Sequence, residues 1–456
     1  MDGSPDIILL TLDSLRADYC SCFGGKAETP SIDSIAEEGI LYTNTRSTAS
    51  WTVPSISSLF TGQLPSTVGA YANSERFEIP REETLAGRLK SSGYQTFGVS
   101  ANPWLSEEFG FDSGFDELRR VRNEVPFPAA DYPPVRDWAD TWRRKAREIA
   151  RWISRSPMKR GANLFAHYQS EGPYANADAV NDELVKFLRL ESPKFIFANY
   201  MDVHEPYHDQ GGSKSAIEYP LEVDWNLHSL VTPPRTDPET IREAYRESVE
   251  YLDEIVGEFL EALKKNNLFD NSLIIIASDH GQALGEHGFW GHGTFLHESL
   301  LHVPLIVKPP SSWDIQSVPK NIDTNISLKW VYDLVCRVSQ NEGSKRTILQ
   351  PERQENHPVI AESHGSPQDI ALSLPGDQSK LARSFIFEEI KTIHLDNPSR
   401  ELLFAEGEKP TDRLNTVIQT SRKISSELPP LGTEDKNNIK KPEGRTEQQL
   451  KNLGYL

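Results

Sequence analysis

Short, nearly continuous apolar runs alternate with amphipathic segments between Asp6 and Lys308. Such runs, rich in Ile, Leu, Phe and Val, predict buried strands, and the segments between them predict helices. We expect strands at Asp6–Leu12, Tyr94–Ser100, Phe195–Met201, Ser272–Ser278 and Val303–Lys308, and helices at Ser31–Glu38, Thr84–Ser91, Asn181–Leu190 and Pro238–Asn266. Buried strands that alternate with helices indicate an α/β fold with a large, mainly parallel sheet sandwiched by helices.

Two regions depart from this pattern. Residues from about 119 to 180 are rich in Arg, Trp and Pro and predict a helical insertion. After Pro310 short strands are expected at 357–362, 383–394 and 401–405, which indicates a smaller α+β domain. We therefore divide the chain into a large domain, a C-terminal α+β domain and a charged, partly disordered tail, at residues 1–315, 316–430 and 431–456.

Composition narrows the class of protein. The chain has 456 residues, 37% hydrophobic and 25% charged, as in soluble globular proteins. Its net charge of −19 argues against a nucleic-acid partner, because that binding depends on clustered cations. No segment approaches the roughly 20 apolar residues of a membrane span, and the N-terminus lacks the features of a signal peptide. With only three cysteines and hence no disulfide framework, we expect a cytoplasmic protein.

Polar residues follow three of the predicted strands. Asp13 follows the first, Asp202 and His204 follow the third, and Asp279 and His280 follow the fourth. One such pair alone is compatible with helix capping or a surface position. Three together predict a pocket, because the carboxyl ends of parallel strands meet at one edge of a sheet. Carboxylate and imidazole groups suit a divalent metal such as Mn, Zn or Mg, which would attract an anionic substrate to this acidic chain.

A candidate nucleophile lies at the start of a predicted helix. The segment Ser50–Gly62 has Pro54 in its first turn and ends in glycine. A hydroxyl at this position lies where backbone N–H groups favour an anion, and metal coordination can activate it for attack. From this segment alone, an N-cap role for Thr52 is the simpler interpretation.

Six ordered blocks resemble the sulfatase family of the alkaline-phosphatase-like superfamily, whose members are metal-dependent ester hydrolases. They are LLTLDSLRADYCSCFGG, TPSIDSIAEEGILYTN, TVPSISSLFTG, GFDSGFDEL, YMDVHEPY and ASDHGQALGEHGFWGHG. The resemblance extends from about Asp6 to Pro310, so residues 1–315 would form the catalytic domain. It implies that Asp13, Asp279 and His280 bind the metal, and that Thr52 is a nucleophile which also touches it.

The same resemblance suggests residues that contact the substrate. His204 matches a histidine that contacts the ester or leaving group. His292 stands where many members have a lysine or histidine that assists the leaving oxygen. Weaker candidates for substrate binding are Arg16, Asn102 and Asp202.

Departures from the family pattern alter the expected chemistry. Sulfatases have a cysteine or serine at the position of Thr52, which is oxidised to formylglycine, and later an arginine where this chain has Ile56. Threonine is not a substrate for that oxidation, so no formylglycine is expected. His280 replaces an asparagine, which shifts the metal preference from Ca towards Mn or Zn. We expect one divalent ion (Mn, Zn, Ca or Mg), with a second ion at Asp202, His204 and His292 as an alternative.

The missing formylglycine bears on the substrate. A formylglycine hydrate expels sulfate by collapsing to the aldehyde, whereas a sulfated threonine has no such exit. A phosphothreonine can instead be hydrolysed by water. We therefore predict a hydrolase of small anionic sulfate or phosphate esters, with phosphomonoesters, phosphodiesters or phosphonate esters favoured. The alternatives are a phospho-alcohol transferase, disfavoured by the lack of a membrane segment, and an inactive sulfatase-like binding protein, disfavoured by the intact set of site residues.

Overall fold

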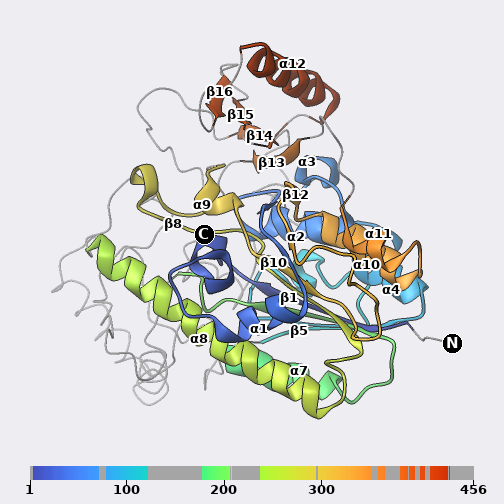
Figure 1. Cartoon of the computed structure of the whole chain (residues 1–456). Helices are drawn as coiled ribbons and strands as arrows, with labels where there is room; N and C mark the ends of the chain where they lie inside the picture. The colour runs from blue at the N-terminus through green and yellow to red at the C-terminus, as the bar shows by residue number, and fades with distance from the viewer. Residues whose placement is uncertain are drawn as a thin grey trace, which may run out of the picture.

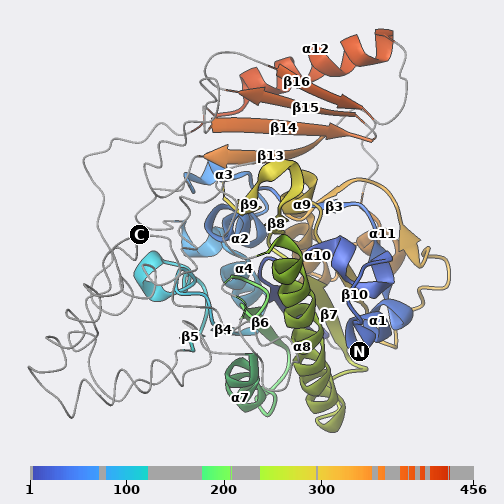
Figure 2. The ribbon, with the colours of Figure 1, turned by 90° about the vertical axis from the view of Figure 1, so that its left-hand side faces the viewer.

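The computed structural model places an eight-stranded sheet between helices and a separate four-stranded sheet at one end of the molecule (Figures 1 and 2). It describes residues 4–70, 79–121, 177–205, 207, 237–293, 296–351, 358–364, 381–388, 390–395, 401–405, 411–429 and 431. Most of the predicted helical insertion (122–176) and nearly all of the predicted charged tail (432–456) lie outside the described residues.

The large sheet has the strand order β11-β2-β10-β7-β1-β6-β4-β5. Its central strand β1 pairs in parallel with both β6 and β7, whereas β10 runs antiparallel to its two neighbours. All five predicted strands are present, and the mainly parallel sheet is confirmed. The strand bounds are β1 Asp6–Leu12, β2 Ile40–Tyr42, β4 Gln95–Ser100, β5 Glu117–Arg120, β6 Lys194–Tyr200, β7 Ser272–Ala277, β10 Leu305–Lys308 and β11 Asn321–Ile322.

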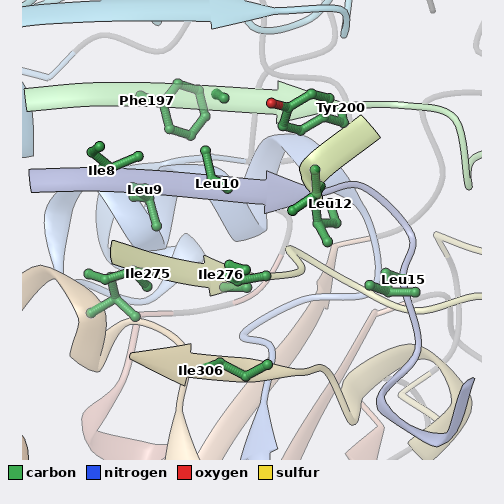
Figure 3. Packing of buried hydrophobic residues seen from close by; sticks show 14 of the residues in the cluster. Ile8, Leu9, Leu10, Leu12, Leu15, Phe197, Tyr200, Ile275, Ile276 and Ile306 are labelled. Carbon is green, nitrogen blue, oxygen red and sulfur yellow. The ribbon is translucent and has the colours of Figure 1, made fainter. Parts of the chain in front are cut away.

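The apolar character of the central strands follows from their burial on both faces. Every residue of β1, β6 and β7 is buried, and Leu9 lies opposite Phe197 on one side and Ile275 on the other. Figure 3 shows the side chains of these strands packed across the sheet. Each fully buried side chain of this kind contributes about 1.5–3 kcal/mol relative to an exposed one. This core fixes the strand ends that carry the site.

Helices cover both faces of the large sheet. On one face α8 (Pro238–Lys265) contacts α1 (Pro30–Glu38) and α7 (Ala177–Phe187), and on the other α2 (Thr52–Thr61), α4 (Leu85–Ser91) and α10 (Trp330–Ser339) pack together. The four helices predicted from the alternating pattern thus correspond to α1, α4, α7 and α8, and the helix predicted within Ser50–Gly62 corresponds to α2. Asp237 caps α8 by accepting a hydrogen bond from Thr240 N. Among the described residues, no helix combines the length and the apolar character needed to cross a membrane.

The C-terminal sheet is antiparallel and is contacted by α12 (Thr411–Glu427). Its strands are β13 Val359–His364, β14 Leu381–Phe387, β15 Ile390–Leu395 and β16 Glu401–Ala405. The segment 383–394, expected as one strand, is instead a hairpin, with Glu388 in the turn at a positive φ of 44°. Asn321–Ile322 and α10 still belong to the large sheet and its core, which therefore extends past residue 315.

Short elements complete the connections. β3 pairs with β12, and β8 pairs with β9. The hydrogen bond from Glu362 N to Thr48 O (2.8 Å) joins β13 to the segment that precedes α2. The bounds of the short elements are β3 Thr45–Arg46, β8 Ala283–Leu284, β9 Trp290–Gly291, β12 Ile326–Ser327, α3 Pro65–Val68, α9 Glu298–Leu301 and α11 Lys345–Leu349.

Candidate active site

Four neighbouring strands deliver polar side chains to one edge of the sheet. Asp13 follows β1, Asn102 follows β4, His204 follows β6 and Asp279 follows β7, and all four are fully buried. The turn after β1 contains Ser14 in the left-handed region (φ 65°), a conformation that costs a non-glycine residue about 1 kcal/mol. The Tyr245 hydroxyl, which donates to Ser14 O (2.7 Å), holds this turn in place.

Asp13, Asp279 and His280 form the first group of candidate metal ligands. Their potential ligand atoms lie within 4.8 Å of one another. His280 Nε2 is 3.5 Å from Asp13 Oδ1 and 3.7 Å from Asp279 Oδ2. His280 Nδ1 donates to Gly281 O (2.8 Å), which leaves Nε2 as the nitrogen with a lone pair. Burial lowers the pKa of His280, which favours the neutral imidazole that binds metals.

The pKa values of the two carboxyl groups in this group are shifted in opposite directions. Burial and the nearby Asp13 carboxylate raise the pKa of Asp279 well above its ordinary value. Burial also acts to raise the pKa of Asp13. Electrostatic attraction to the His280 and His204 imidazoles, together with a hydrogen bond from Asn102, nevertheless holds this pKa below its ordinary value. Within the described part of the chain, Asp279 Oδ2 is buried without a hydrogen-bond partner. A divalent cation fits this set, because it would neutralise the carboxylates and bind the orphaned oxygen.

Thr52 lies beside this group at the first residue of α2. Its Oγ1 is 3.3 Å from Asp13 Oδ2, 3.3 Å from His280 Nε2 and 3.3 Å from Asn102 Nδ2. The N-cap residue of α2 is Trp51, so the N-cap interpretation of Thr52 is wrong. The Thr52 hydroxyl is instead fully buried among the candidate metal ligands.

Hydroxyls flanking Thr52 fix the helix start. Ser47 Oγ and Ser55 Oγ both donate to Asp279 O, at 2.5 and 2.6 Å. These bonds tie the segment around α2 to the end of β7. The position of Thr52 relative to Asp279 is therefore set by the backbone of both elements.

His204, Glu205 and His292 form a second group, also fully buried or nearly so. Glu205 Oε1 lies 3.4 Å from His292 Nδ1, and Glu205 Oε2 lies 3.7 Å from His204 Nδ1. Gln282 joins the group: its Nε2 donates to Glu205 Oε2 (2.7 Å), and its Oε1 accepts from His292 Nδ1 (3.0 Å). Although burial alone would raise the pKa of Glu205, the two imidazoles hold it far below its ordinary value.

Sequence reasoning missed Glu205 and Gln282. Glu205 directly follows the predicted His204, and Gln282 lies two residues after His280. Their proximity to predicted residues is the only signal, since Glu and Gln are ordinary surface residues. Asn102, a weak candidate, does join the site: its Nδ2 donates to Asp13 Oδ2 (2.9 Å).

The structure places two weak candidates in other roles. Asp202 Oδ1 accepts a hydrogen bond from Ala177 N (3.1 Å) at the start of α7, and burial raises its pKa to about 7. Arg16 forms ion pairs with Asp18 (2.7 Å) and Glu286 (2.5 Å). Neither residue belongs to the two groups of candidate ligands. Asp202 is accordingly not part of the second group, in which Glu205 takes its place.

The large, mainly parallel sheet between helices, together with its small antiparallel companion, defines an α/β protein with two sheets. Within that class, residues 5–329 match the sulfatase family model, and the chain belongs to the sulfatase family.

Curated relatives are sulfatases at low identity. Choline-sulfatase of Rhizobium meliloti is 25% identical over 342 residues, which cover 68% of this chain and 63% of that protein. N-acetylglucosamine-6-O-sulfatase of Bacteroides thetaiotaomicron is 24% identical, over 71% of this chain and 66% of that protein. The chain thus aligns with less than two thirds of the length of either enzyme.

Solved structures show the same fold. The phosphonate monoester hydrolase of Agrobacterium radiobacter superimposes with a TM-score of 0.65 at 17% identity, over 92% of this chain and 95% of that one. A 2-O glycosaminoglycan sulfatase, BT1596, gives a TM-score of 0.63 at 14% identity, over 93% and 92%. At these identities the likeness establishes the fold alone.

Proposed function

We propose that this protein is a metal-dependent hydrolase of small anionic esters, with phosphate and phosphonate esters preferred to sulfate esters, and that Thr52 is its nucleophile. The observation that carries the proposal is the position of Thr52 Oγ1, 3.3 Å from both Asp13 Oδ2 and His280 Nε2 at the N-terminus of α2. Neighbouring Asp13 and His280 can activate a hydroxyl at this position, and the N-terminus of the helix favours a bound anionic ester.

Asp13, Asp279, His280 and Thr52 are the proposed ligands of one divalent ion, of which Zn and Mn best suit this mixed oxygen and nitrogen set. When bound, the ion would supply Lewis-acid polarisation of the ester and lower the pKa of the threonine hydroxyl. Asn102, whose amide donates towards both Asp13 and Thr52, orients these two oxygens.

The reaction has two displacements. Thr52 Oγ forms a bond to phosphorus, the bond from phosphorus to the leaving alcohol oxygen breaks, and the hydroxyl proton passes to a basic group of the pocket. Water then attacks phosphorus, the bond from phosphorus to Thr52 Oγ breaks, and a proton from the water restores the Thr52 hydroxyl. The product is phosphate from a monoester, a phosphate monoester from a diester, or a phosphonate from a phosphonate ester. His204 and His292 assist the departing alcohol, a contribution typically worth about 10²–10⁴ in rate when it takes the form of proton transfer.

Threonine explains the preference for phosphoryl esters. It cannot form the aldehyde through which a formylglycine enzyme expels sulfate, so a sulfated Thr52 would need attack by water at sulfur. The relatives are nevertheless named as sulfatases, and sulfate esters stay in the assay as the second candidate.

The test is turnover of a substrate panel by metal-reconstituted protein, using aryl phosphate monoesters, phosphodiesters, phosphonate esters and sulfates. We expect phosphoryl turnover that falls by at least about a thousandfold in Thr52→Ala. The control is Ser58→Ala, because Ser58 lies on the same helix and its hydroxyl donates to the helix backbone, at Pro54 O (3.2 Å). Turnover of no ester by the metal-loaded wild type would overturn the enzyme proposal, and turnover that survives Thr52→Ala would overturn the nucleophile.

A further inference from the structure

Gln282 joins two residues of the site that lie far apart in the sequence. Its side chain is buried, at 1% exposure. Gln282 Nε2 donates to Glu205 Oε2 (2.7 Å), and Gln282 Oε1 accepts from His292 Nδ1 (3.0 Å). We propose that Gln282 and Glu205 are positioning residues, which hold the His292 ring so that only its Nε2 acts on the ester. This role rests on the proposed function, in which His292 assists the departing alcohol.

Glu205 sets the direction of these hydrogen bonds. Burial alone would raise the pKa of Glu205, but the His292 and His204 imidazoles hold it far below its ordinary value, so this carboxylate only accepts hydrogen bonds. Gln282 must therefore turn its amide nitrogen towards Glu205 and its amide oxygen towards His292. Because that oxygen cannot donate, His292 Nδ1 keeps its hydrogen, and Nε2 is the ring nitrogen left to face the ester.

The backbone of Gln282 is held in place as well. Arg16 Nη1 donates to Gln282 O (3.1 Å). Arg16 is itself fixed by its ion pairs with Asp18 (2.7 Å) and Glu286 (2.5 Å). Gln282 is thus anchored through both its main chain and its side chain. Supporting hydrogen bonds of this kind keep a functional side chain within the small displacements that catalysis tolerates.

The His292 ring lies against the group that contains the proposed nucleophile. It stacks on the His280 ring, with centroids 4.7 Å apart and an interplanar angle of 29°. His280 Nε2 in turn lies 3.3 Å from Thr52 Oγ1. A half-turn of the His292 imidazole would exchange Nε2 for a ring carbon and would break the hydrogen bond from Nδ1 to Gln282. The hydrogen bond therefore opposes the one rotation that would remove Nε2 from this surface.

Glu205 faces imidazoles and not a structural cation. Among the described residues no lysine or arginine forms an ion pair with it, although Glu205 is only 7% exposed. Its carboxylate oxygens lie 3.4 Å from His292 Nδ1 and 3.7 Å from His204 Nδ1. His204 Nδ1 also donates to the backbone oxygen of Glu205 (2.6 Å). The negative charge of Glu205 thus favours a hydrogen on Nδ1 of both rings.

The first experiment compares esters whose leaving alcohols differ in acidity. Zn²⁺-loaded, full-length wild type and Gln282→Met are assayed at equal metal content on nitrophenyl and phenyl esters of the class that the wild type hydrolyses. Methionine keeps the length of glutamine but makes neither hydrogen bond. We expect kcat for the phenyl ester to fall by about 100-fold in Gln282→Met, since a displaced His292 no longer assists a poor leaving group. The nitrophenyl ester, whose leaving group needs little assistance, should lose much less.

Two comparisons show whether Gln282 acts through His292. In a His292→Ala background, Gln282→Met should cause no additional loss, because the ring that it positions is absent. Asp202→Asn is the matched control. Asp202 is a buried carboxylate three residues before Glu205 that accepts a hydrogen bond from Ala177 N, and its substitution should keep the leaving-group dependence of the wild type. An equal loss for both esters in Gln282→Met, or an additional loss in the His292→Ala background, would overturn the positioning role and leave the proposed function standing.

A second experiment observes the ring itself and needs neither turnover nor a folded Gln282 variant. Nitrogen NMR of the Zn²⁺-loaded wild type, labelled at its histidines, shows which ring nitrogen of His292 carries hydrogen, and the signal is assigned by its absence from His292→Ala. We expect a hydrogen on Nδ1. An Nδ1 without hydrogen would overturn the inference even if esters are hydrolysed. A wild type that hydrolyses no ester but carries this hydrogen would reject the proposed function and support the orientation of His292.

Discussion

Asp279 in the candidate site and Glu362 in the C-terminal sheet are both fully buried carboxylates, but their surroundings differ completely. Glu362 accepts hydrogen bonds from Ser66 N (2.8 Å), Ser66 Oγ (2.8 Å) and Arg383 Nε (2.7 Å), and its charge is matched by the Arg383 guanidinium. Asp279 lies beside a second carboxylate, with Oδ2 unbonded among the described residues. The first arrangement is complete within the chain, whereas the second needs a cation from outside it.

This contrast separates a structural carboxylate from a functional one. A buried carboxylate whose charge is paired and whose hydrogen bonds are satisfied is part of the folded structure. Removal of either partner destabilises the protein, because it leaves the other charge buried without compensation. A buried carboxylate left incomplete lowers the stability of the free protein and is retained where a ligand completes it. Substitution of each residue should therefore have opposite consequences for stability and turnover.

The largest effect is expected from Asp279→Asn. Removing this proposed ligand should lower turnover on the order of 10³-fold, the scale of losing one strong electrostatic contact to the reacting group. The stability of the metal-free protein should stay the same or rise, because repulsion with Asp13 disappears. Turnover and thermal unfolding in chelator, measured side by side, check both parts. A metal-free Asp279→Asn protein that is markedly destabilised would contradict the contrast with Glu362.

Glu362→Gln should instead affect stability first. It leaves the Arg383 guanidinium buried without its counter-charge, which we expect to cost about 3 kcal/mol in the free energy of unfolding. Urea denaturation of the wild type, Glu362→Gln and the double variant Glu362→Gln/Arg383→Met measures this cost. The double variant should recover part of the loss, because it removes both charges. If Glu362→Gln is as stable as the wild type, Glu362 and Arg383 do not form a stabilising pair.

The two carboxylates also differ in how far the sequence predicts them. Asp279 ends an apolar run, and strand periodicity together with the ordered motif blocks is enough to place it beside Asp13. Ser66 and Glu362 are 296 residues apart, and no local pattern links them. Glu205 was not predicted because its neighbours Gln282 and His292 are distant in the sequence and contact it only in the folded chain. The short strands β2, β5 and β11 were missed because two to four residues carry little periodicity.

The effect of added metal on stability should also distinguish Asp279 from Glu362. A cation that binds only the folded protein stabilises it by about 2.7 kcal/mol at a concentration 100 times its Kd. Mn²⁺ or Zn²⁺ should therefore raise the melting temperature of the stripped wild type and of Glu362→Gln, but much less that of Asp279→Asn. Differential scanning fluorimetry across a metal titration measures the shift. Equal shifts in all three proteins would place the binding away from Asp279.

The smallest effect is expected at Glu298, a paired but partly exposed carboxylate between the two sheets. Burial alone would raise the pKa of Glu298. The charges of Lys391 in β15 and Arg46 in β3 instead lower this pKa to about 2. Its contribution to stability is thus present above the unfolded pKa of about 4.3 and is lost as the pH falls from about 5 to 2.

Two opposing features keep this contribution small. Burial lowers the pKa of Lys391 despite its carboxylate partner, so desolvation offsets part of the attraction. The Glu298 side chain is also 45% exposed, and solvent screens such a pair to about 1 kcal/mol. Unfolding curves at pH 7 and pH 4 should therefore show Glu298→Gln less stable than the wild type by about that amount at pH 7, with the difference shrinking at pH 4. A constant difference between the two pH values would mean that Glu298 acts through packing and not through its charge.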